Sequence, residues 1–284
     1  MSFTALIEVD SLAALKVPAV LVDCRFDLSD PEAGRRAYAA GHIPGARYAD
    51  LNLDLSSPVT SDSGRHPLPA PDALAVFFAA AGIGDQTQVV AYDEANGSLA
   101  ARAWWLLRWL GHAAVAVLDG GFKAWVAAGG AVEAGGGPPA PGGAQGPVTV
   151  RLHPEMVLTA PDVQRALEDP RRLLVDARAA ERFAGTVEPL DRVAGHVPGA
   201  VNHPFTANLA GDGRFLAPDE LRRRWLTRLR GTEPSDAILM CGSGVTACHN
   251  ILAMASAGLP GGKLYAGSWS EWIRDPERPV ARGV

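Results

Sequence analysis

The chain has 284 residues, of which 48% are hydrophobic and 20% charged, and its formal net charge is −5. This is the composition of a globular protein long enough for two domains, and the acidic balance argues against nucleic acid as a partner. No uninterrupted apolar run approaches the ~18 residues of a membrane span, so we expect no membrane association.

The three cysteines, Cys24, Cys241 and Cys248, are too few and too widely spread for a disulfide framework. No Cys-x-x-Cys pair suggests a redox motif or half of a zinc site, and we expect reduced thiols and no metal or organic cofactor. The first residues show neither a basic start nor a cleavable apolar core, so we expect a cytoplasmic protein. The basic cluster 222–224 is interpreted as the solvated face of a helix.

In chain order, short aliphatic runs at 20–22, 89–92 and 115–118 alternate with a segment of helical spacing at 104–110. Residues 135–147 then hold ten Gly or Pro in thirteen positions, which is typical of a linker. The second half adds an apolar run at 237–240 and a helical pattern over 245–259. Such alternation predicts α/β domains, each a mainly parallel sheet with helices on both faces, at 1–134 and 148–284.

The two halves repeat one another. Val-Asp-Cys-Arg at 22–25 recurs as Val-Asp-Ala-Arg at 175–178, and Gly-His-Ile-Pro-Gly-Ala at 41–46 recurs as Gly-His-Val-Pro-Gly-Ala at 195–200. The segments 118–125 and 264–272 also match, in the same order. Because His42 and His196 occur in both copies, we interpret them as residues of the fold rather than as catalysts.

The most informative segment is a glycine-rich loop that opens with a cysteine and leads into a helix. Glycines allow the backbone N–H groups to converge on one point, and a helix N-terminus favours thiolate over thiol. We therefore predict Cys241 as a nucleophile at the carboxyl end of a strand, where ligands bind in parallel sheets. The loop residues assigned to it are Gly242, Ser243, Gly244, Val245 and Thr246.

The other two cysteines are interpreted as small hydrophobic residues. Cys248 continues the apolar stripe of the helix, and Cys24 has Ala177 as its counterpart in the repeat. The first half has Asp-Glu-Ala-Asn-Gly-Ser at 93–98 where the second has the cysteine loop. One copy is thus predicted to be catalytic and the other structural.

The six-residue loop, the Gly-His-x-Pro-Gly-Ala motif and the Asp-x-Arg after the first strand, all in tandem copies, resemble the rhodanese superfamily of sulfurtransferases. The resemblance covers nearly the whole chain outside the linker, and it implies two rhodanese-like domains, the second carrying a cysteine that cycles through a persulfide. Thiosulfate-preferring members usually have Cys-Arg-Lys-Gly-Val-Thr, whereas Cys-Gly-Ser-Gly-Val-Thr is the pattern of 3-mercaptopyruvate sulfurtransferases.

The same resemblance implies roles for residues outside the loop. Arg182 and Arg192 are similar to the family's paired substrate arginines, although the segment between them is one residue longer and has Asp191 where proline is usual. His66 corresponds to a histidine that is proposed to assist proton transfer beside Ser243 together with an aspartate, here Asp54 or Asp50.

The expected function is transfer of sulfur from a small-molecule donor, 3-mercaptopyruvate or thiosulfate, through Cys241 to cyanide or to a thiol such as thioredoxin or a small thiol. A thiosulfate-preferring enzyme and a non-catalytic rhodanese-like binding module are the alternatives. A phosphatase or arsenate reductase would need arginine at position 247 to clamp an oxyanion, and this chain has Ala247.

Overall fold

The computed structural model describes residues 2–136 and 148–283, and the chain divides into two compact units. Unit 1 consists of Met1–Ser57, Leu68–His153 and Gly211–Phe215, and unit 2 of Pro58–Pro67, Pro154–Ala210 and Leu216–Val284. Each unit therefore takes one short segment from the other half of the sequence. Of the linker predicted at 135–147, residues 137–147 lie outside the described residues.

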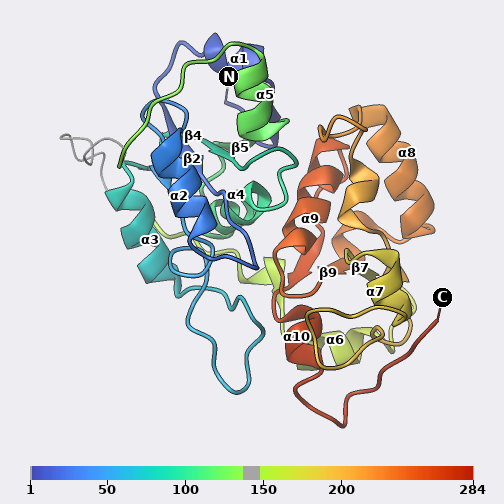
Figure 1. Cartoon of the computed structure of the whole chain (residues 1–284). Helices are drawn as coiled ribbons and strands as arrows, with labels where there is room; N and C mark the ends of the chain where they lie inside the picture. The colour runs from blue at the N-terminus through green and yellow to red at the C-terminus, as the bar shows by residue number, and fades with distance from the viewer. Residues whose placement is uncertain (1, 137–147, 284) are drawn as a thin grey trace. The chain divides into compact units, whose positions relative to one another are not determined.

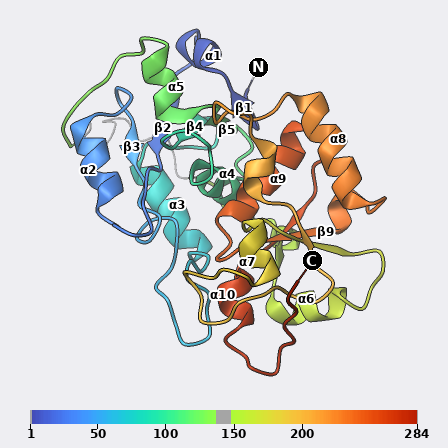
Figure 2. The ribbon, with the colours of Figure 1, turned by 45° about the vertical axis from the view of Figure 1, so that its right-hand side comes forward.

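Unit 1 is built on a five-stranded parallel sheet with strand order β1-β5-β4-β2-β3 (Figures 1 and 2). Its strands are β1 Leu6–Ile7, β2 Ala19–Asp23, β3 Arg47–Tyr48, β4 Gln88–Tyr92 and β5 Val115–Leu118. Its helices are α1 Val9–Ala13, α2 Ala33–Ala40, α3 Pro71–Ala80, α4 Ala100–Trp109 and α5 Gly121–Ala127.

Unit 2 repeats this plan with the order β6-β10-β9-β7-β8, again with all strands parallel. Its strands are β6 Val157–Leu158, β7 Leu173–Asp176, β8 Val201–Asn202, β9 Ala237–Met240 and β10 Lys263–Tyr265. Its α-helices are α6 Ala160–Ala166, α7 Ala180–Ala184, α8 Pro218–Leu229, α9 Thr246–Ser256 and α10 Ser268–Trp272. Short 3-10 turns occupy Pro154–Met156, Phe205–Asn208 and Pro234–Asp236.

Both sheets are covered on both faces. Successive side chains of a strand point to opposite faces, and every residue of β4 and of β9 is buried. In unit 1, Val90 and Tyr92 pack with residues of α1, α2 and α5, while α4 contacts β4 and β5. In unit 2, Ile238 and Met240 pack with α6 and α10, while α9 contacts β9 and β10. The predicted fold class is confirmed.

The repeated Asp-x-Arg motif joins the sheet to the Gly-His loop in each unit. Arg25 bonds the carboxylate two residues before it and donates to the Gly41 carbonyl at 2.6 Å. Arg178 makes the same bonds, with the Gly195 carbonyl at 2.8 Å. Both guanidiniums and their carboxylate partners are buried. Replacing either member of a pair would therefore leave the charge of the other buried without its partner, which is strongly destabilising.

The repeated histidines serve the fold in the same way in both units. His42 stacks on Tyr38 with ring centroids 4.0 Å apart, and its Nδ1 lies 2.8 Å from the Tyr38 carbonyl. His196 stacks on Phe183 at 3.8 Å, with Nδ1 also 2.8 Å from that residue's carbonyl. This identical use in both units supports the interpretation of these histidines as structural.

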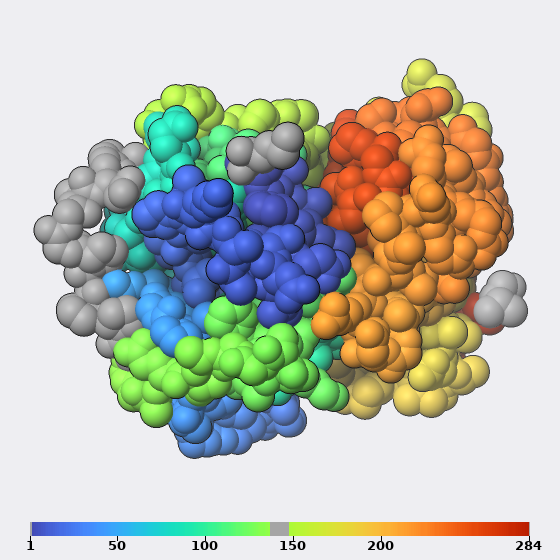
Figure 3. All heavy atoms as spheres, turned by 90° about the horizontal axis from the view of Figure 1, so that it is seen from above, coloured from blue at the N-terminus to red at the C-terminus, as the bar shows by residue number. Residues whose placement is uncertain are grey.

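The basic cluster 222–224 lies on α8, and residues of this part of the chain, orange in Figure 3, form part of the surface of unit 2. Arg223 and Arg224 both pair with Glu220, and Arg222 donates to the carbonyls of Ala257 and Gly258. Two of the three arginines thus have an ion-pair partner on the same helix, and the third donates to backbone carbonyls. This is expected for a solvated helix face. No helix within the described residues has the length and hydrophobicity that crossing a membrane requires.

Candidate active site

Cys241 directly follows β9, and the loop it opens leads into α9. The N–H of Gly244 donates to the Cys241 sulfur at 3.1 Å, and the thiol of Cys248 donates to the Gly244 carbonyl at 3.3 Å. Gly244 has a φ of +79°, a conformation that glycine adopts without strain. Cys241 is buried, with 2% of its surface exposed.

The backbone around Cys241 is fixed by the start of α10. The Cys241 N–H donates to Ser268 Oγ at 3.1 Å, and that hydroxyl donates to the Tyr265 carbonyl at 2.9 Å. Ser268 has a φ of 54°, which is strained for a residue with a side chain, and the matching residue of unit 1 is Gly121, with a φ of 57°. The strain is thus retained in the unit where the hydroxyl has a partner.

Segment 58–67, which comes from the first half of the sequence, belongs to unit 2 and places two functional side chains beside the loop. His66 Nδ1 lies 2.8 Å from Ser243 Oγ, and both residues are buried. The Arg65 N–H donates to Ser270 Oγ at 3.0 Å, and the Ser270 N–H donates to the Gly242 carbonyl at 2.9 Å. The structure therefore brings His66 and the predicted loop together.

Arg182 lies beside the loop, held by two carboxylates. It bonds Glu188 at 2.7 Å and Asp191 at 3.1 Å. Burial alone would raise the pKa of Glu188, but the bonds from Arg182 and from nearby N–H groups lower it below its ordinary value. A Cβ built on Gly242 would lie 3.6 Å from both terminal nitrogens of Arg182, so the guanidinium lies next to the residue after Cys241.

Arg65 is a site residue that sequence reasoning missed. Its Nη1 bonds Asp191, and its Nη2 would be 2.9 Å from a Cβ on Gly242. The only signal in the sequence is that Arg65 precedes His66. The charge arrangement around Asp191 could not be anticipated, because its two arginine partners come from different halves of the chain.

Arg192, the second predicted substrate arginine, is directed elsewhere. Its Nη2 donates to the carbonyl of Ile273 at 2.7 Å and of Arg274 at 3.4 Å, at the carboxyl end of α10. It lines a small pocket of about 250 Å³ together with Arg65 and Asp191. A cation at a helix C-terminus is a favourable structural arrangement in its own right.

The predicted aspartates belong to unit 1. The carboxylate of Asp54 accepts the N–H of Asp50 at 2.8 Å, and burial raises its pKa. Asp50 in turn accepts the N–H groups of Asn52 and Leu53. These bonds give both aspartates a local role in unit 1, and the pairing of either with His66 stays a prediction.

Unit 1 has a carboxylate where unit 2 has its thiol. Tyr92 and Met240 occupy equivalent strand positions, because their carbonyls accept the N–H of Cys24 and of Ala177 respectively. Asp93 therefore corresponds to Cys241. Its carboxylate accepts four N–H groups, those of Ala95, Gly97, Leu99 and Ala100. These four hydrogen bonds lower the pKa of Asp93, but burial outweighs them and the pKa is raised. The N–H groups of this loop are consumed by a side chain of the protein itself.

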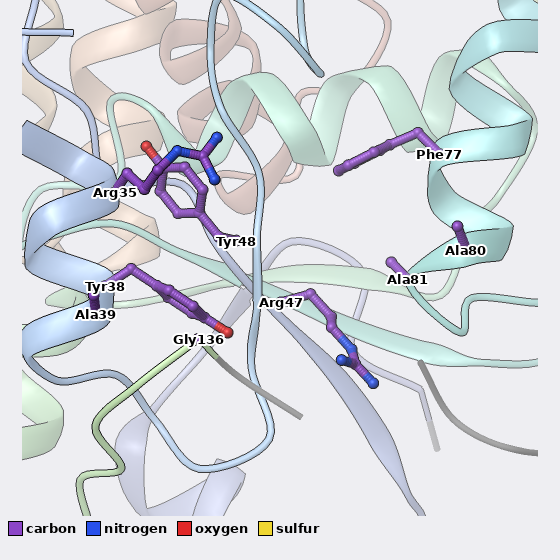
Figure 4. Close-up of a pocket in the computed structure, with 9 residues that line it drawn as sticks. All are labelled: Arg35, Tyr38, Ala39, Arg47, Tyr48, Phe77, Ala80, Ala81 and Gly136. Atoms are coloured by element: carbon purple, nitrogen blue, oxygen red, sulfur yellow. The ribbon is translucent and has the colours of Figure 1, made fainter. Parts of the chain in front are cut away.

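Two pockets lined by described residues of unit 1 contain no cysteine. One pocket of about 440 Å³ lies against the Asp93 loop. Another, of about 450 Å³, has Arg35 over the ring of Tyr48 (Figure 4). The hydroxyls of Tyr38 and Tyr48 in this pocket donate to backbone carbonyls. Within residues 2–136 and 148–283, no group of three or more His, Cys, Asp or Glu side chains is arranged to hold a metal ion.

Comparison with known proteins agrees with this geometry. The family model described as "Rhodanese-like domain" matches residues 8–128 and 159–275. The chain is 51% identical to "Probable 3-mercaptopyruvate sulfurtransferase" of Pseudomonas aeruginosa over 100% of both chains. It is 42% identical to "Putative thiosulfate sulfurtransferase SseB" of Mycobacterium tuberculosis over 94% of this chain and 92% of that one. A structure of 3-mercaptopyruvate sulfurtransferase from Leishmania major superposes with a TM-score of 0.83 at 33% identity, covering 96% of this chain and 76% of that one.

Proposed function

Because the chain belongs to the rhodanese-like family and is a sulfurtransferase, we propose that Cys241 accepts a sulfur atom from 3-mercaptopyruvate and passes it to a thiol or to cyanide. The observation that carries the proposal is the Gly244 N–H aimed at the Cys241 sulfur, next to the Arg182 guanidinium. The first group stabilises an anionic sulfur, and the second offers a charge-assisted bond to the carboxylate of the donor.

In the first step the Cys241 thiolate attacks the sulfur of 3-mercaptopyruvate. The new S–S bond forms as the C–S bond breaks, and its electron pair leaves on carbon as the enolate of pyruvate. A proton is needed at that carbon to give pyruvate. Ser243, hydrogen-bonded to His66, is the hydroxyl of the loop that has a buried imidazole to exchange protons with.

In the second step an acceptor nucleophile attacks the outer sulfur of the Cys241 persulfide and restores the thiolate. Cyanide would leave as thiocyanate, and a small thiol or reduced thioredoxin would leave as a persulfide. Such acceptors are found in the cytoplasm, where we place the protein; its three free cysteines are in keeping with a reducing compartment.

The test is mass spectrometry of the protein after exposure to 3-mercaptopyruvate without acceptor. We expect a gain of one sulfur atom on Cys241 and its loss, as thiocyanate, on addition of cyanide. Cys241→Ser should gain no sulfur and produce no thiocyanate. Cys24→Ala is the matched control, because alanine stands at the equivalent position of unit 2, and it should behave like the parent. Sulfur transfer by Cys241→Ser would refute the proposal.

Steady-state kinetics with both donors, together with the mass spectrometry, separates the alternatives. A thiosulfate-preferring enzyme would show a higher kcat/KM with thiosulfate than with 3-mercaptopyruvate. A binding module would leave Cys241 unmodified by either donor. The glycine at position 242 favours 3-mercaptopyruvate, because the dianion thiosulfate gains most from charged side chains on the loop itself.

A further inference from the structure

Two guanidinium groups with unused N–H donors meet at Gly242. Arg65 bonds Asp191 through Nη1, and Arg182 bonds Glu188 and Asp191 through Nε and Nη2. Within the part of the chain that the structure describes, Arg65 Nη2 and Arg182 Nη1 make no hydrogen bond. These two nitrogens lie 2.9 and 3.6 Å from the position of a Cβ on Gly242.

The two arginine side chains that carry these unused donors are also accessible to a ligand. The Arg65 side chain is 29% exposed and that of Arg182 is 16% exposed, whereas the carboxylates that hold them are at most 4% exposed. A carboxylate that reaches this place can accept one N–H from each arginine, which is a strong and directional arrangement. Because Gly242 has no side chain, the place next to Cys241 is left vacant for Arg65.

Asp191 fixes the geometry of this pair. One of its oxygens accepts from Arg65 and the other from Arg182, so a single buried carboxylate sets the spacing of the two guanidiniums. Arg192, by contrast, donates to the carbonyls at the end of α10 and has no hydrogen bond to Asp191 in the described structure. Its position in the sequence is that of a substrate arginine, but its guanidinium caps a helix.

We infer that Arg65, rather than Arg192, is the second arginine that binds the carboxylate of the sulfur donor, with Asp191 as the positioning residue for both Arg65 and Arg182. The inference rests on the proposed function, because it assumes that the sulfur donor also carries a carboxylate group. It predicts that donor specificity depends on a residue outside the cysteine loop and outside the segment that carries Arg182.

The first test is kinetic. Arg65→Met should lower kcat/KM for 3-mercaptopyruvate about tenfold or more, mainly through KM, because a bond to a charged carboxylate is lost in ground and transition state alike. Arg65→Lys should recover part of the loss. Arg192→Met is the competing variant. If Arg192→Met raises KM and Arg65→Met does not, the inference is wrong.

A double variant distinguishes binding from mere neutralisation of Asp191. In Arg65→Met the buried Asp191 charge loses one partner and could repel the donor by itself. Arg65→Met/Asp191→Asn removes that charge while keeping an acceptor for Arg182. If Arg65 binds the donor, KM stays raised in the double variant. If KM returns to the parent value, Arg65 only screens Asp191, and the inference is overturned.

The second test does not depend on turnover. Iodoacetate and iodoacetamide alkylate a thiolate by the same displacement of iodide and differ in carrying a carboxylate or a neutral amide. We expect Arg65→Met to lower the ratio of the iodoacetate rate to the iodoacetamide rate at Cys241 about tenfold, with Arg192→Met leaving it near the parent value. A loosened fold would change both rates together, so an unchanged ratio in Arg65→Met refutes the inference even if that variant is less stable.

This readout also separates the two proposals. A parent protein that forms no persulfide with 3-mercaptopyruvate, yet shows the expected change in alkylation ratio, would refute the proposed donor and uphold carboxylate binding by Arg65. A parent protein that forms the persulfide, with a ratio insensitive to Arg65, would do the reverse.

Discussion

In the mechanism proposed above, His66 and Ser243 are the pair of side chains through which a proton reaches the departing enolate. Their contact at 2.8 Å joins residues 177 positions apart in the sequence. The neutral imidazole of His66 has two tautomers, and either of them can exchange a proton with the Ser243 hydroxyl.

We predict that His66→Asn lowers kcat for 3-mercaptopyruvate by about a hundredfold and changes KM little. The asparagine amide can keep a hydrogen bond to Ser243 but cannot exchange a proton, and general acid–base catalysis contributes about 10²–10⁴-fold. Steady-state kinetics checks this, with iodoacetamide alkylation of Cys241 as the control for an intact loop. A variant with the parent's kcat would show that His66 only positions Ser243.

Among the elements, the loop between β9 and α9 contains two glycines with different physical roles. Gly244 requires glycine, because its φ is +79° and a Cβ would overlap the Ala266 carbonyl. Gly242 has no positive φ, and a Cβ there meets the flexible end of Arg65. The first glycine shapes the backbone, and the second leaves space for a ligand and its arginines.

Gly244→Ala should therefore reduce the free energy of unfolding by about 2 kcal/mol or more, because it combines a left-handed conformation with a clash against backbone. Gly242→Ala should leave the free energy of unfolding within about 0.5 kcal/mol of the parent and raise KM for 3-mercaptopyruvate. Urea denaturation and steady-state kinetics measure the two effects. Equal destabilisation by both substitutions would contradict the distinction.

Sequence periodicity located the elements with strong signals. The strands β2, β4, β5 and β9 and the helices α4 and α9 lie where the aliphatic runs and helical spacing predicted them. The two-residue strands β1, β3, β6 and β8 are too short to show a period, and they are fixed by pairing with their neighbours.

The site was predictable as far as it is local. A glycine-rich loop after a strand indicates a reactive cysteine from its own residues, and the structure gives Cys241 the expected N–H contact. The ion pair between Arg65 and Asp191 joins residues 126 positions apart, so no pattern along the chain could indicate it. For the same reason the direction of the Arg192 side chain could not be predicted, since its acceptors lie at the end of α10.

On the scale of the whole molecule, ionisation of Asp119 in unit 1 makes the free energy of unfolding depend on pH. The pKa of Asp119 is raised to about 6, mainly by burial. The negative charges of Glu8 and Asp212 also raise it. The Phe215 N–H, which donates to the carboxylate at 2.9 Å, and the positive charge of Arg214 lower it. The folded protein therefore holds this proton up to a higher pH than the unfolded chain, whose aspartates titrate near ~3.9. Stability from this group falls as the pH rises from about 4 to about 6.

Asp119→Asn removes this penalty and keeps an acceptor for the Phe215 N–H. We expect the variant to exceed the parent in free energy of unfolding by about 2 kcal/mol at pH 7.5, with the difference disappearing near pH 4. Urea denaturation at both pH values checks this. A difference of the same size at both pH values would mean that packing, rather than ionisation, distinguishes the two side chains.

The segment 58–67 leaves unit 1 and belongs to unit 2, and it carries His66 and Arg65 with it. A gene fragment that encoded only the reactive half would lose both residues. The proposed chemistry therefore draws on both halves of the sequence, because the first half supplies two of the side chains that lie beside the Cys241 loop.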